Sequence, residues 1–420
     1  ETRMDWAWFR SVFFAVNDGG FRVVAACLLL AELFISLFIV KRVPYTEIDW
    51  STYMQQVAIY SKGERNYSRI EGDTGPVVYP AGFLVIFQML SVVTSAGTSI
   101  RTAQNIFIFL YLVNLLLVFR LYFKSKEVAP FVLVFLTVTG YRIHSIFMLR
   151  LFNDPIAMLF FYIAANFFVS NLWLRGCIFY SLSVSVKMNV LLFSPALFFL
   201  LLINCGCSSA FWHISVCAII QLALALPFLS VDPVAYISRS FDLGQVFLFK
   251  WTVNWRFLPE SVFLDRRLHA ALLLSHIILV SSFAFFMWFR SHGGLLRCIR
   301  QLHHGIRTRI GATECLYALF TANLLGMVVA RSLHFQFYSW YFHQLPFLLF
   351  RNSNLSTVNV KSLLQIGWRT GVLLAVEFAW NTYPSTVLSS TLLHLAHLVI
   401  LIHLFFERRT VSRPTKSKLF

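Results

Sequence analysis

Long apolar runs recur along almost the whole of this 420-residue chain, and they restrict its fold more than any other feature. Hydrophobic residues make up 58% of the chain and charged residues only 13%, a balance that no soluble core could bury. Because a helix satisfies its own backbone hydrogen bonds in lipid, we expect every membrane segment to be helical. The sequence therefore predicts an all-α polytopic membrane protein with roughly 11 to 13 membrane segments. We place them at residues 23–40, 103–123, 128–149, 154–170, 177–204, 211–229, 270–289, 312–330, 338–350, 362–380 and 387–406, and at 81–97, which either spans the membrane or re-enters it.

The basic residues indicate the direction in which the chain crosses the membrane. The net charge is +17, but no nucleic-acid-binding module is recognisable and the charge is spread over loops, so we expect no nucleic-acid partner. The loop 290–311 and the tail 407–420 are rich in basic residues, and the positive-inside bias predicts that both are cytosolic. The loop 41–80 has balanced charge and is predicted to lie on the opposite side. The segment 230–269 is predicted to lie on the same side as 41–80 if the apolar run 177–204 folds as two half-spans that are broken around Lys187.

The predicted membrane segments form a single domain over residues 23–406. Residues 1–22 carry several aromatic side chains and are predicted to form an interfacial helix. No cleavable signal pattern is recognisable, so the first span is expected to be retained. No internal repeat is evident, which counts against transporter folds built on repeats.

Polar side chains within or beside the apolar runs are the most informative ones, because each is costly unless it is paired or hydrated. Glu32 and Lys187 either form an interhelical ion pair or serve catalysis. Trp340 and Trp380, taken singly, are typical of the aromatic belt at a membrane interface. The complete set is Glu32, Arg142, His144, Arg150, Asn153, Asp154, Lys187 and Glu377.

Carboxylates gather directly after the first apolar run. The stretch YTEIDWSTY contains Glu47 and Asp49, and GDTGPVVYP contains Asp73. Basic and aromatic residues accompany them on the same predicted side, within 247–260 and 331–346. A carboxylate at the membrane boundary can deprotonate an attacking hydroxyl, while cations stabilise a departing phosphate and aromatic faces suit sugar rings. This combination indicates sugar transfer from a lipid phosphate.

Several stretches also occur in an order that resembles one known family. They are TEIDW, GDTGPVVYPAGF, RIHSIFMLRLFNDP, SVKMNVLLFSPALFFLL, SRSFDLGQVFLFKWTVNWRFLPE, SLHFQFYSWYFHQLP and WNTYPST. From about residue 43 to about residue 400, the chain resembles the endoplasmic-reticulum dolichyl-phosphate-mannose-dependent α-1,3-mannosyltransferases of asparagine-linked glycosylation, in glycosyltransferase superfamily C. The resemblance implies a GT-C-type helical bundle and inverting transfer of one mannose to Man5GlcNAc2-PP-dolichol, which gives the Man6 form. It also implies a multi-pass protein of the endoplasmic-reticulum membrane with a luminal active site and a cytosolic C-terminus.

The resemblance further implies roles for particular residues. Glu47 and Asp49 match the acidic signature of the first luminal loop, so Asp49 is expected to be the base, with Glu47 supporting geometry or acceptor sugars and Asp73 as the second candidate. No metal and no other cofactor is expected. The expected partners are the donor lipid dolichyl-phosphate-mannose, the dolichyl-diphosphate-linked oligosaccharide acceptor and membrane lipids, with no obligatory protein partner evident. Candidates for contact with the donor phosphate or substrate are Arg331 and His334, ranked first, and Gln336, Tyr338, Arg150, Asp154, Lys187 and Arg256.

Two other classes of function stay open. A transporter or scramblase would use Glu32, Lys187 and Glu377 as a polar path across the bilayer. Another dolichyl-phosphate-mannose user of the same superfamily would act on a glycolipid anchor or a protein hydroxyl. Two short signals bear on location: the ending KSKLF resembles a dilysine retrieval signal, and Asn66 begins a glycosylation sequon in the loop predicted to be luminal.

Overall fold

The computed structural model describes the chain in three ranges, residues 12–242, 248–351 and 360–407. The first half of the interfacial helix predicted over 1–22, residues 1–11, therefore lies outside the described residues, as does the tail 407–420 beyond its first residue, including its lysine signal. Within the described ranges the fold is helical apart from one small two-stranded sheet. The predicted all-α class is confirmed.

The first half of the chain contains the sheet and the helices that carry most of the predicted site. In chain order these elements are α2 (Asp18–Arg42), α3 (Trp50–Ser61), β1 (Glu71–Gly72), β2 (Gly75–Pro76), α4 (Ala81–Val93), α5 (Ile100–Ser125), α6 (Phe135–Val138), α7 (Tyr141–His144), α8 (Asp154–Phe168) and α9 (Trp173–Val186). The strands pair in antiparallel register, with Glu71 opposite Pro76 and Gly72 opposite Gly75.

The second half is helical throughout its described part. Its helices are α10 (Ser194–Cys205), α11 (Cys207–Leu229), α12 (Pro233–Ser240), α13 (Glu260–Phe263), α14 (Arg266–Phe283), α15 (Phe289–Ser291), α16 (Leu295–His303), α17 (Ala312–Val328), α18 (Leu345–Phe350), α19 (Val360–Asn381) and α20 (Val387–Phe406). Short 3-10 turns lie between them, including η4 (Met188–Phe193) and η7 (Phe335–Trp340).

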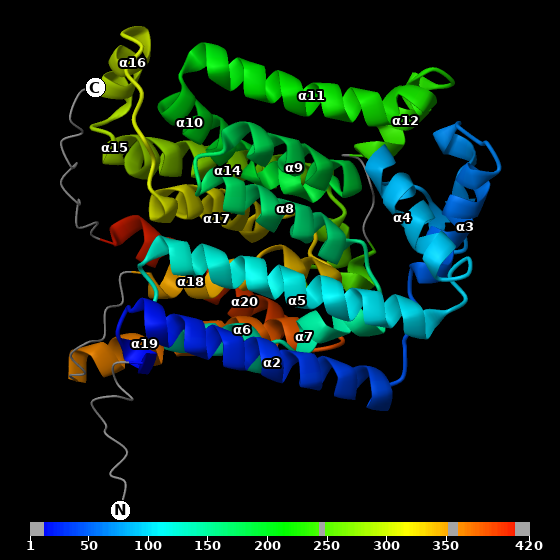
Figure 1. The fold of residues 1–420 in the computed structure, drawn as a ribbon, viewed down its shortest axis with the longest axis horizontal. Helices are drawn as coiled ribbons and strands as arrows, with labels where there is room; N and C mark the ends of the chain where they lie inside the picture. Colours follow the sequence, from blue (N-terminus) through cyan, green and yellow to red (C-terminus); the bar gives the residue numbers. More distant parts are fainter. Residues whose placement is uncertain (1–11, 243–247, 352–359, 408–420) are drawn as a thin grey trace, which may run out of the picture.

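The long helices α2, α5, α8, α9 and α11 lie side by side in that order (Figure 1). Buried residues recur at helical spacing along α5, as in Tyr111, Asn114, Leu115 and Val118, so one face of the helix packs against its neighbours. A polar contact joins two of these helices, because the Asn114 side-chain amide of α5 donates to the carbonyl of Pro155 in α8 at 3.2 Å.

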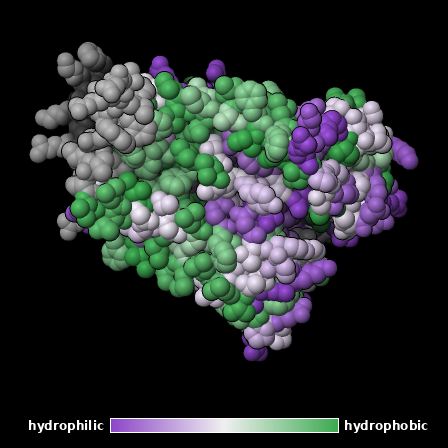
Figure 2. Space-filling model, turned by 90° about the horizontal axis from the view of Figure 1, so that it is seen from below, coloured by the Kyte–Doolittle hydropathy of each residue, from purple (hydrophilic) through white to green (hydrophobic). Residues whose placement is uncertain are grey.

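The first long helix, α2, has one face toward the bundle and one away from it. Leu30, Phe34 and Phe38 are exposed at intervals of four residues, whereas Glu32 and Ser36 are fully buried between them. This pattern is typical of a span with one lipid-facing side. Figure 2 shows hydrophobic residues over the middle of the molecule and hydrophilic residues gathered at the end that carries α3 and α4.

Six of the described helices are long and apolar enough to cross a membrane, and the bent pair Pro130–Val138 and Tyr141–Leu149 can count as a seventh span. Three shorter apolar helices, α4, α8 and α17, come in addition. This number is below the roughly 11 to 13 segments expected from hydropathy, because several apolar runs fold as short or broken helices packed within the bundle. The segment 81–97 is one of them: α4 has 13 residues and rises about 20 Å, less than the roughly 30 Å of hydrocarbon.

The apolar run 177–204 is interrupted at Lys187, as the sequence predicted. Helix α9 ends at Val186, and Lys187 has extended backbone angles, φ −157° and ψ 127°. The short turn η4 follows, and α10 then starts at Ser194. The break allows the Lys187 side chain to leave the helical array instead of facing lipid.

The two long polar segments meet at one end of the bundle. The Asn66 side-chain amide donates to Oδ2 of Asp232 at 3.3 Å, and the backbone N–H of Ala81 donates to the hydroxyl of Tyr236 at 3.3 Å. Figure 1 shows α3, α4 and α12 together at this end. We call it the α3 end.

The basic loop lies at the opposite end. Thr308 donates its backbone N–H to the carbonyl of Ile203 at 3.0 Å. Arg351 is paired with Glu407 at 2.5 Å, which ties the start of the basic tail to the same region. In Figure 1, α16 lies at this end. The basic loop and the tail therefore begin on the side away from α3.

Candidate active site

Helix α3 starts from the acidic pair at the α3 end. Glu47 lies just before the helix, where Oε1 accepts the backbone N–H of Ser51 at 3.0 Å and Oε2 accepts the hydroxyl of Tyr45. A carboxylate at this position is favourable because the first turn of a helix has unpaired N–H groups and a partial positive charge. Glu47 therefore holds the start of α3 and the Tyr45 side chain in place.

Asp49 is the N-terminal flanking residue of α3 and is partly buried. Its two carboxylate oxygens accept long hydrogen bonds, from Tyr53 and from Thr74, each at 3.4 Å. Burial raises the pKa of this carboxyl group, the nearby Lys187 ammonium opposes that increase, and the Asp154 carboxylate adds to it. The site thus contains a carboxylate whose proton affinity is increased and whose hydrogen bonds are weak.

Lys187 is held by two residues at the start of α8. Its Nζ lies 2.8 Å from Oδ1 of Asp154 and 3.1 Å from Oδ1 of Asn153. The ion pair is buried, with side-chain exposures of 10% for Lys187 and 0% for Asp154. Asp154 also accepts the indole N–H of Trp340. A buried cation with these partners has a fixed position, and removing one partner is strongly destabilising.

Aromatic rings surround the Lys187 ammonium. Its Nζ is 5.4 Å from the ring centres of Tyr79 and Phe337 and 5.7 Å from that of Trp340, within the range of cation–π attraction. Phe337 stacks on Trp340 at 4.0 Å, and His334 stacks on Phe337 at 5.3 Å. We call the group formed by Asp49, Asp154, Lys187 and these rings the Lys187 cluster.

His334 is near the cation, but it is not itself a cation at neutral pH. Burial, together with the neighbouring Lys187 charge, lowers the pKa of His334 to about 4. The imidazole is therefore neutral and can donate or accept a single hydrogen bond through each nitrogen. The sequence analysis ranked His334 with Arg331 as a cation for the donor phosphate. A neutral imidazole contributes a hydrogen bond to the site and not a positive charge.

The other acid predicted for the site lies on the small hairpin. Asp73 is exposed in the turn between β1 and β2, where its carboxylate accepts the side-chain amide of Gln55 at 2.7 Å and its backbone N–H donates to the same side chain at 2.8 Å. The next residue, Thr74, contacts Asp49. The described contacts thus place Asp73 in support of the hairpin, whereas Lys187 acts on Asp49.

The remaining predicted cations are distributed over the neighbouring loops. Arg256 donates to the carbonyl of Phe249 at 2.9 Å and stacks on the ring of the same residue. Arg150 donates to the hydroxyl of Ser145. Arg331 interacts electrostatically with the carboxylate of Asp242. Burial lowers the pKa of both Arg150 and Arg331. Lys187 is the basic side chain that the fold brings to Asp49.

Two further predicted residues lie on η7. Gln336 is half-buried, and its backbone carbonyl accepts the Ser339 hydroxyl at 2.9 Å. Tyr338 is buried, stacks on Trp380 at 4.9 Å, and donates its hydroxyl to Glu377. Tyr338 therefore belongs to a separate polar group around Glu377.

The possible ion pair between Glu32 and Lys187 is not formed. Glu32 instead lies 2.6 Å from the ring Nε2 of His144, with both side chains almost fully buried, and Lys187 pairs with Asp154. Glu377 is bound by Tyr338 and by the side-chain amide of Asn381. Each buried acid thus has its own local partner.

Three rings of the Lys187 cluster, Tyr79, Phe337 and Trp340, were not among the predicted site residues, and neither was Asn153, which binds the Lys187 ammonium. Asn153 directly precedes Asp154 in the stretch NDP, and this adjacency was an available signal. Trp340 was interpreted as part of an interfacial belt, because sequence alone does not show that its N–H meets Asp154. Across the described ranges, no group of three or more His, Cys, Asp or Glu side chains could hold a metal ion.

The fold and this cluster define a class of protein: an all-α polytopic membrane protein with a buried acid and cation pair facing a partly buried aspartate at one end of the bundle. Within this class, the model of the ALG3 protein family matches residues 26–390, and the chain belongs to that family. The resemblance found in the sequence is confirmed.

Named relatives are similar over nearly their whole length. The mouse (Mus musculus) Dol-P-Man:Man(5)GlcNAc(2)-PP-Dol alpha-1,3-mannosyltransferase is 48% identical over 387 residues, which cover 92% of this chain and 87% of that protein. The human (Homo sapiens) protein of the same name is 47% identical, covering 94% and 89%. The Arabidopsis thaliana protein of that name is 40% identical, covering 91% and 87%.

Proposed function

We propose that this chain is an inverting α-1,3-mannosyltransferase. It moves mannose from dolichyl-phosphate-mannose onto Man5GlcNAc2-PP-dolichol, as the names of its relatives state for them, and gives the Man6 form. The observation that carries the proposal is that contacts link Asp49 to the buried Asp154–Lys187 pair: Asp49 accepts the Tyr53 hydroxyl, the Tyr53 ring packs on Tyr79, and the Tyr79 ring lies 5.4 Å from the Lys187 ammonium. A general base and a fixed cation within one site are what transfer from a lipid phosphate requires.

Asp49 is the general base of the proposed reaction. The donor is β-linked and the product α-linked, so the acceptor hydroxyl attacks the anomeric carbon from the face opposite the phosphate. The bond from that carbon to the acceptor oxygen forms as the bond to the phosphate oxygen breaks, and the hydroxyl proton passes to Asp49. Its raised pKa favours this step, because a stronger base removes the proton more readily.

Lys187 stabilises the leaving group. As dolichyl phosphate departs, negative charge grows on its oxygens, and a preorganised ammonium in a water-poor site stabilises that charge strongly. Asp154 and Asn153 hold the ammonium in position, and their contacts at 2.8 and 3.1 Å leave further N–H capacity on Nζ for a phosphate oxygen. Neutral His334 can donate one more hydrogen bond in the same place.

The aromatic side chains next to Lys187 suit the transferred sugar. The stacked pair Phe337 and Trp340 lies beside the cation, and the ring of Tyr79 is within cation–π distance of it as well. The C–H faces of a mannose ring pack favourably on such surfaces, while its hydroxyl groups stay available to polar partners. The cluster therefore accommodates both parts of the donor headgroup.

The proposed location is the endoplasmic-reticulum membrane with the α3 end in the lumen. The basic loop and the start of the basic tail at the opposite end support this orientation through the positive-inside bias. The sequon at Asn66 gives a direct test, because glycosylation there requires the α3 end to be luminal. If a reagent confined to the cytosolic side modified this loop instead, the orientation of the protein would be the opposite of the proposed one.

A transporter or scramblase is a weaker interpretation. Such a protein needs polar groups that succeed one another through the membrane depth. Glu32, Lys187 and Glu377 each have a separate local partner, His144, Asp154 and Tyr338 respectively. These separate pairs support an enzyme over a continuous polar path.

The proposal is tested by mannose transfer with the purified full-length chain, dolichyl-phosphate-mannose and a synthetic Man5GlcNAc2 diphosphate lipid. Wild type, Asp49→Asn and the matched control Asp73→Asn are compared, since both substitutions keep the shape of the side chain and remove a base. We expect one α-1,3-linked mannose from wild type, near-normal turnover from Asp73→Asn and none measurable from Asp49→Asn. If only the Asp73→Asn variant lost turnover, Asp73 and not Asp49 would be the general base. If the wild-type protein transferred no mannose, the proposed function would be refuted.

A further inference from the structure

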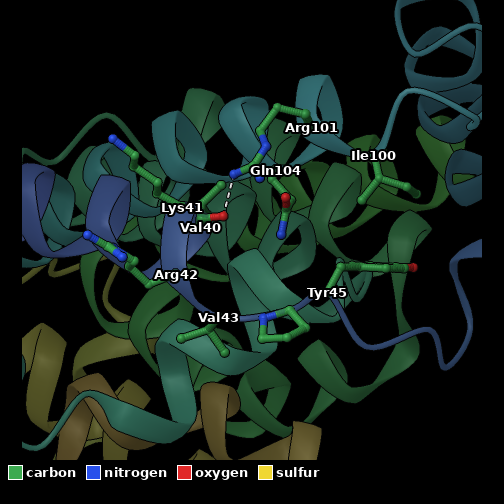
Figure 3. Close-up of a pocket in the computed structure, with 9 residues that line it drawn as sticks. Val40, Lys41, Arg42, Val43, Tyr45, Ile100, Arg101 and Gln104 are labelled. Carbon is green, nitrogen blue, oxygen red and sulfur yellow. Dashed lines mark hydrogen bonds between the residues drawn. The ribbon is translucent and has the colours of Figure 1, made fainter.

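A basic cavity lies where the first span ends, next to the segment that leads to Asp49. It has a volume of about 430 Å³, within the range of about 300–1,000 Å³ that is usual for small-molecule sites. The C-terminal end of α2 and the N-terminal end of α5 line it (Figure 3). Its lining residues are Val40, Lys41, Arg42, Val43, Pro44, Tyr45, Ile100, Arg101 and Gln104.

The lining carries positive charge from two separate helices. Lys41 and Arg42 come from the last turn of α2, Arg101 comes from the first turn of α5, and no carboxylate is among the lining residues. Such a site favours a ligand with about two negative charges, because three nearby cations would otherwise repel one another. Apolar contacts from Val40, Val43 and Ile100 accompany the charges.

The geometry of the cavity is fixed by contacts to buried parts of the bundle. A guanidinium N–H of Arg101 donates to the carbonyl of Val40, which joins the two helix ends (Figure 3). Gln104 is buried and donates its side-chain amide to the carbonyl of Met148 at 2.9 Å. The other N–H groups of Arg101 remain for a ligand, since a guanidinium has five donors.

One wall of the cavity is linked by hydrogen bonds to the start of α3, which begins directly after Asp49. Tyr45 lines the cavity and donates its hydroxyl to Glu47, which in turn holds the start of α3 beside Asp49. In Figure 3, the Tyr45 side chain extends away from the side to which Lys41 and Arg42 extend. Four residues of chain span at most about 14 Å, so this wall lies within a few sugar rings of the base.

The proposed reaction needs two anion sites. The donor phosphate must be at the reacting carbon, where Lys187 is available. The acceptor carries a diphosphate between its lipid and its glycan, so this group is several sugar residues away from the hydroxyl that reacts. A second basic site at the membrane boundary, outside the Lys187 cluster, is therefore required.

We propose that the cavity lined by Lys41, Arg42 and Arg101 binds the diphosphate of the lipid-linked acceptor. This inference rests on the proposed function and extends it. The lipid chain then stays beside α2 in the bilayer, and the glycan passes Tyr45 toward Asp49. Binding at this site acts on acceptor affinity and on the choice of a diphosphate lipid, and leaves the donor and the chemical step unaffected.

The test is steady-state kinetics with the double variant Lys41→Gln and Arg42→Gln of the full-length chain. Both side chains are exposed, so the fold should be retained, and Lys62→Gln, an exposed lysine at the α3 end outside the cavity, is the matched control. Loss of two charged contacts is expected to raise KM for the Man5GlcNAc2 diphosphate lipid about ten- to hundredfold, with kcat and KM for the donor unchanged. Unchanged acceptor KM, or an equal rise in donor KM, would overturn the inference while leaving the mannosyltransferase activity in place.

Inhibition by short lipids separates the two anion sites. Farnesyl diphosphate should compete with the acceptor in wild type and lose potency in the double variant, whereas farnesyl monophosphate should compete with the donor equally in both. A second arm adds phosphatidylinositol to the nanodiscs that hold the enzyme. Competition by this phospholipid in wild type and its loss in the double variant would identify a general site for anionic headgroups and would overturn the assignment to the acceptor. Absence of any transfer by wild type is the distinct outcome that refutes the proposed function.

Discussion

Two carboxylates of this molecule, Asp49 at the α3 end and Glu32 within α2, lie close to basic or titratable side chains but have different surroundings. Glu32 is fully buried and meets His144 directly at 2.6 Å. Asp49 is partly buried, accepts two long contacts of 3.4 Å, and has as its nearby cation a lysine already paired with Asp154. A closed pair stabilises the packing of two helices, whereas an acid beside a pair that is already satisfied keeps the capacity to accept a proton.

The largest expected effect comes from exchanging these two acids for uncharged residues. Asp49→Asn should lower turnover by about 10²–10⁴-fold, the usual contribution of a general base, with little change in the thermal midpoint. Glu32→Leu should retain turnover per folded molecule but destabilise the fold by about 1–3 kcal/mol, because His144 loses its buried partner. Kinetics and thermal unfolding in detergent measure both. A Glu32 variant that is stable and inactive would contradict this contrast.

The next largest effect should come from Lys187. Lys187→Met should lower turnover by about 10²–10³-fold through loss of charge stabilisation on the leaving phosphate. Because Asp154 then lies buried without its partner, the double variant Lys187→Met with Asp154→Leu serves as a control that restores folding and leaves turnover low. Arg331 was ranked first among the cations from the sequence, but Arg331→Gln is expected to lose less turnover than Lys187→Met. A larger loss in the Arg331 variant would assign the phosphate to that residue.

The dependence of turnover on pH should report Asp49. This residue must be ionised to act as a base, and burial raises its pKa, so turnover is complete above the raised value and falls as the pH decreases through it. Lys187 opposes the increase, so the acid limb should move to higher pH in Lys187→Met. His334, with a pKa of about 4, should contribute no limb between pH 5 and 8. If the acid limb of the pH profile were the same in Lys187→Met as in wild type, Lys187 would have no influence on the pKa of Asp49, and the prediction would be wrong.

The smallest predicted effect concerns the aromatic faces. Phe337→Leu keeps an apolar side chain but removes the ring that stacks on Trp340 at 4.0 Å. Aromatic pairs contribute about 0.5–1.5 kcal/mol beyond area burial, so KM for dolichyl-phosphate-mannose should rise about two- to tenfold with turnover little changed. A matched substitution, Phe342→Leu, alters a buried ring that packs on Tyr338 in the other polar group. Equal effects from both variants would point to general packing.

Much of the fold and part of the site could be predicted from the residues alone. Apolar runs identify membrane helices because a polar backbone enters lipid only when its hydrogen bonds are satisfied within the segment. Lys187 indicated a break in its apolar run because an unpaired cation within the membrane is costly. The acidic pair in TEIDW and the family resemblance predicted Asp49 as the base, and the role proposed here for Asp49 keeps that prediction. Six or seven of the described helices are long and apolar enough to cross a membrane by themselves, fewer than the predicted segments, since hydropathy does not distinguish one long helix from short or broken helices within the bundle.

The sequence by itself determined the helical membrane class, the family and the acids at the end of the first span. The tertiary structure alone decided which groups meet: Lys187 with Asp154, Trp340 with Asp154, and Glu32 with His144. The physical reason is distance along the chain, because Trp340 and Asp154 are separated by 186 residues and Glu32 and His144 by 112. Local periodicity sets the face on which a side chain lies, but only the packing of whole helices sets its depth and its partner.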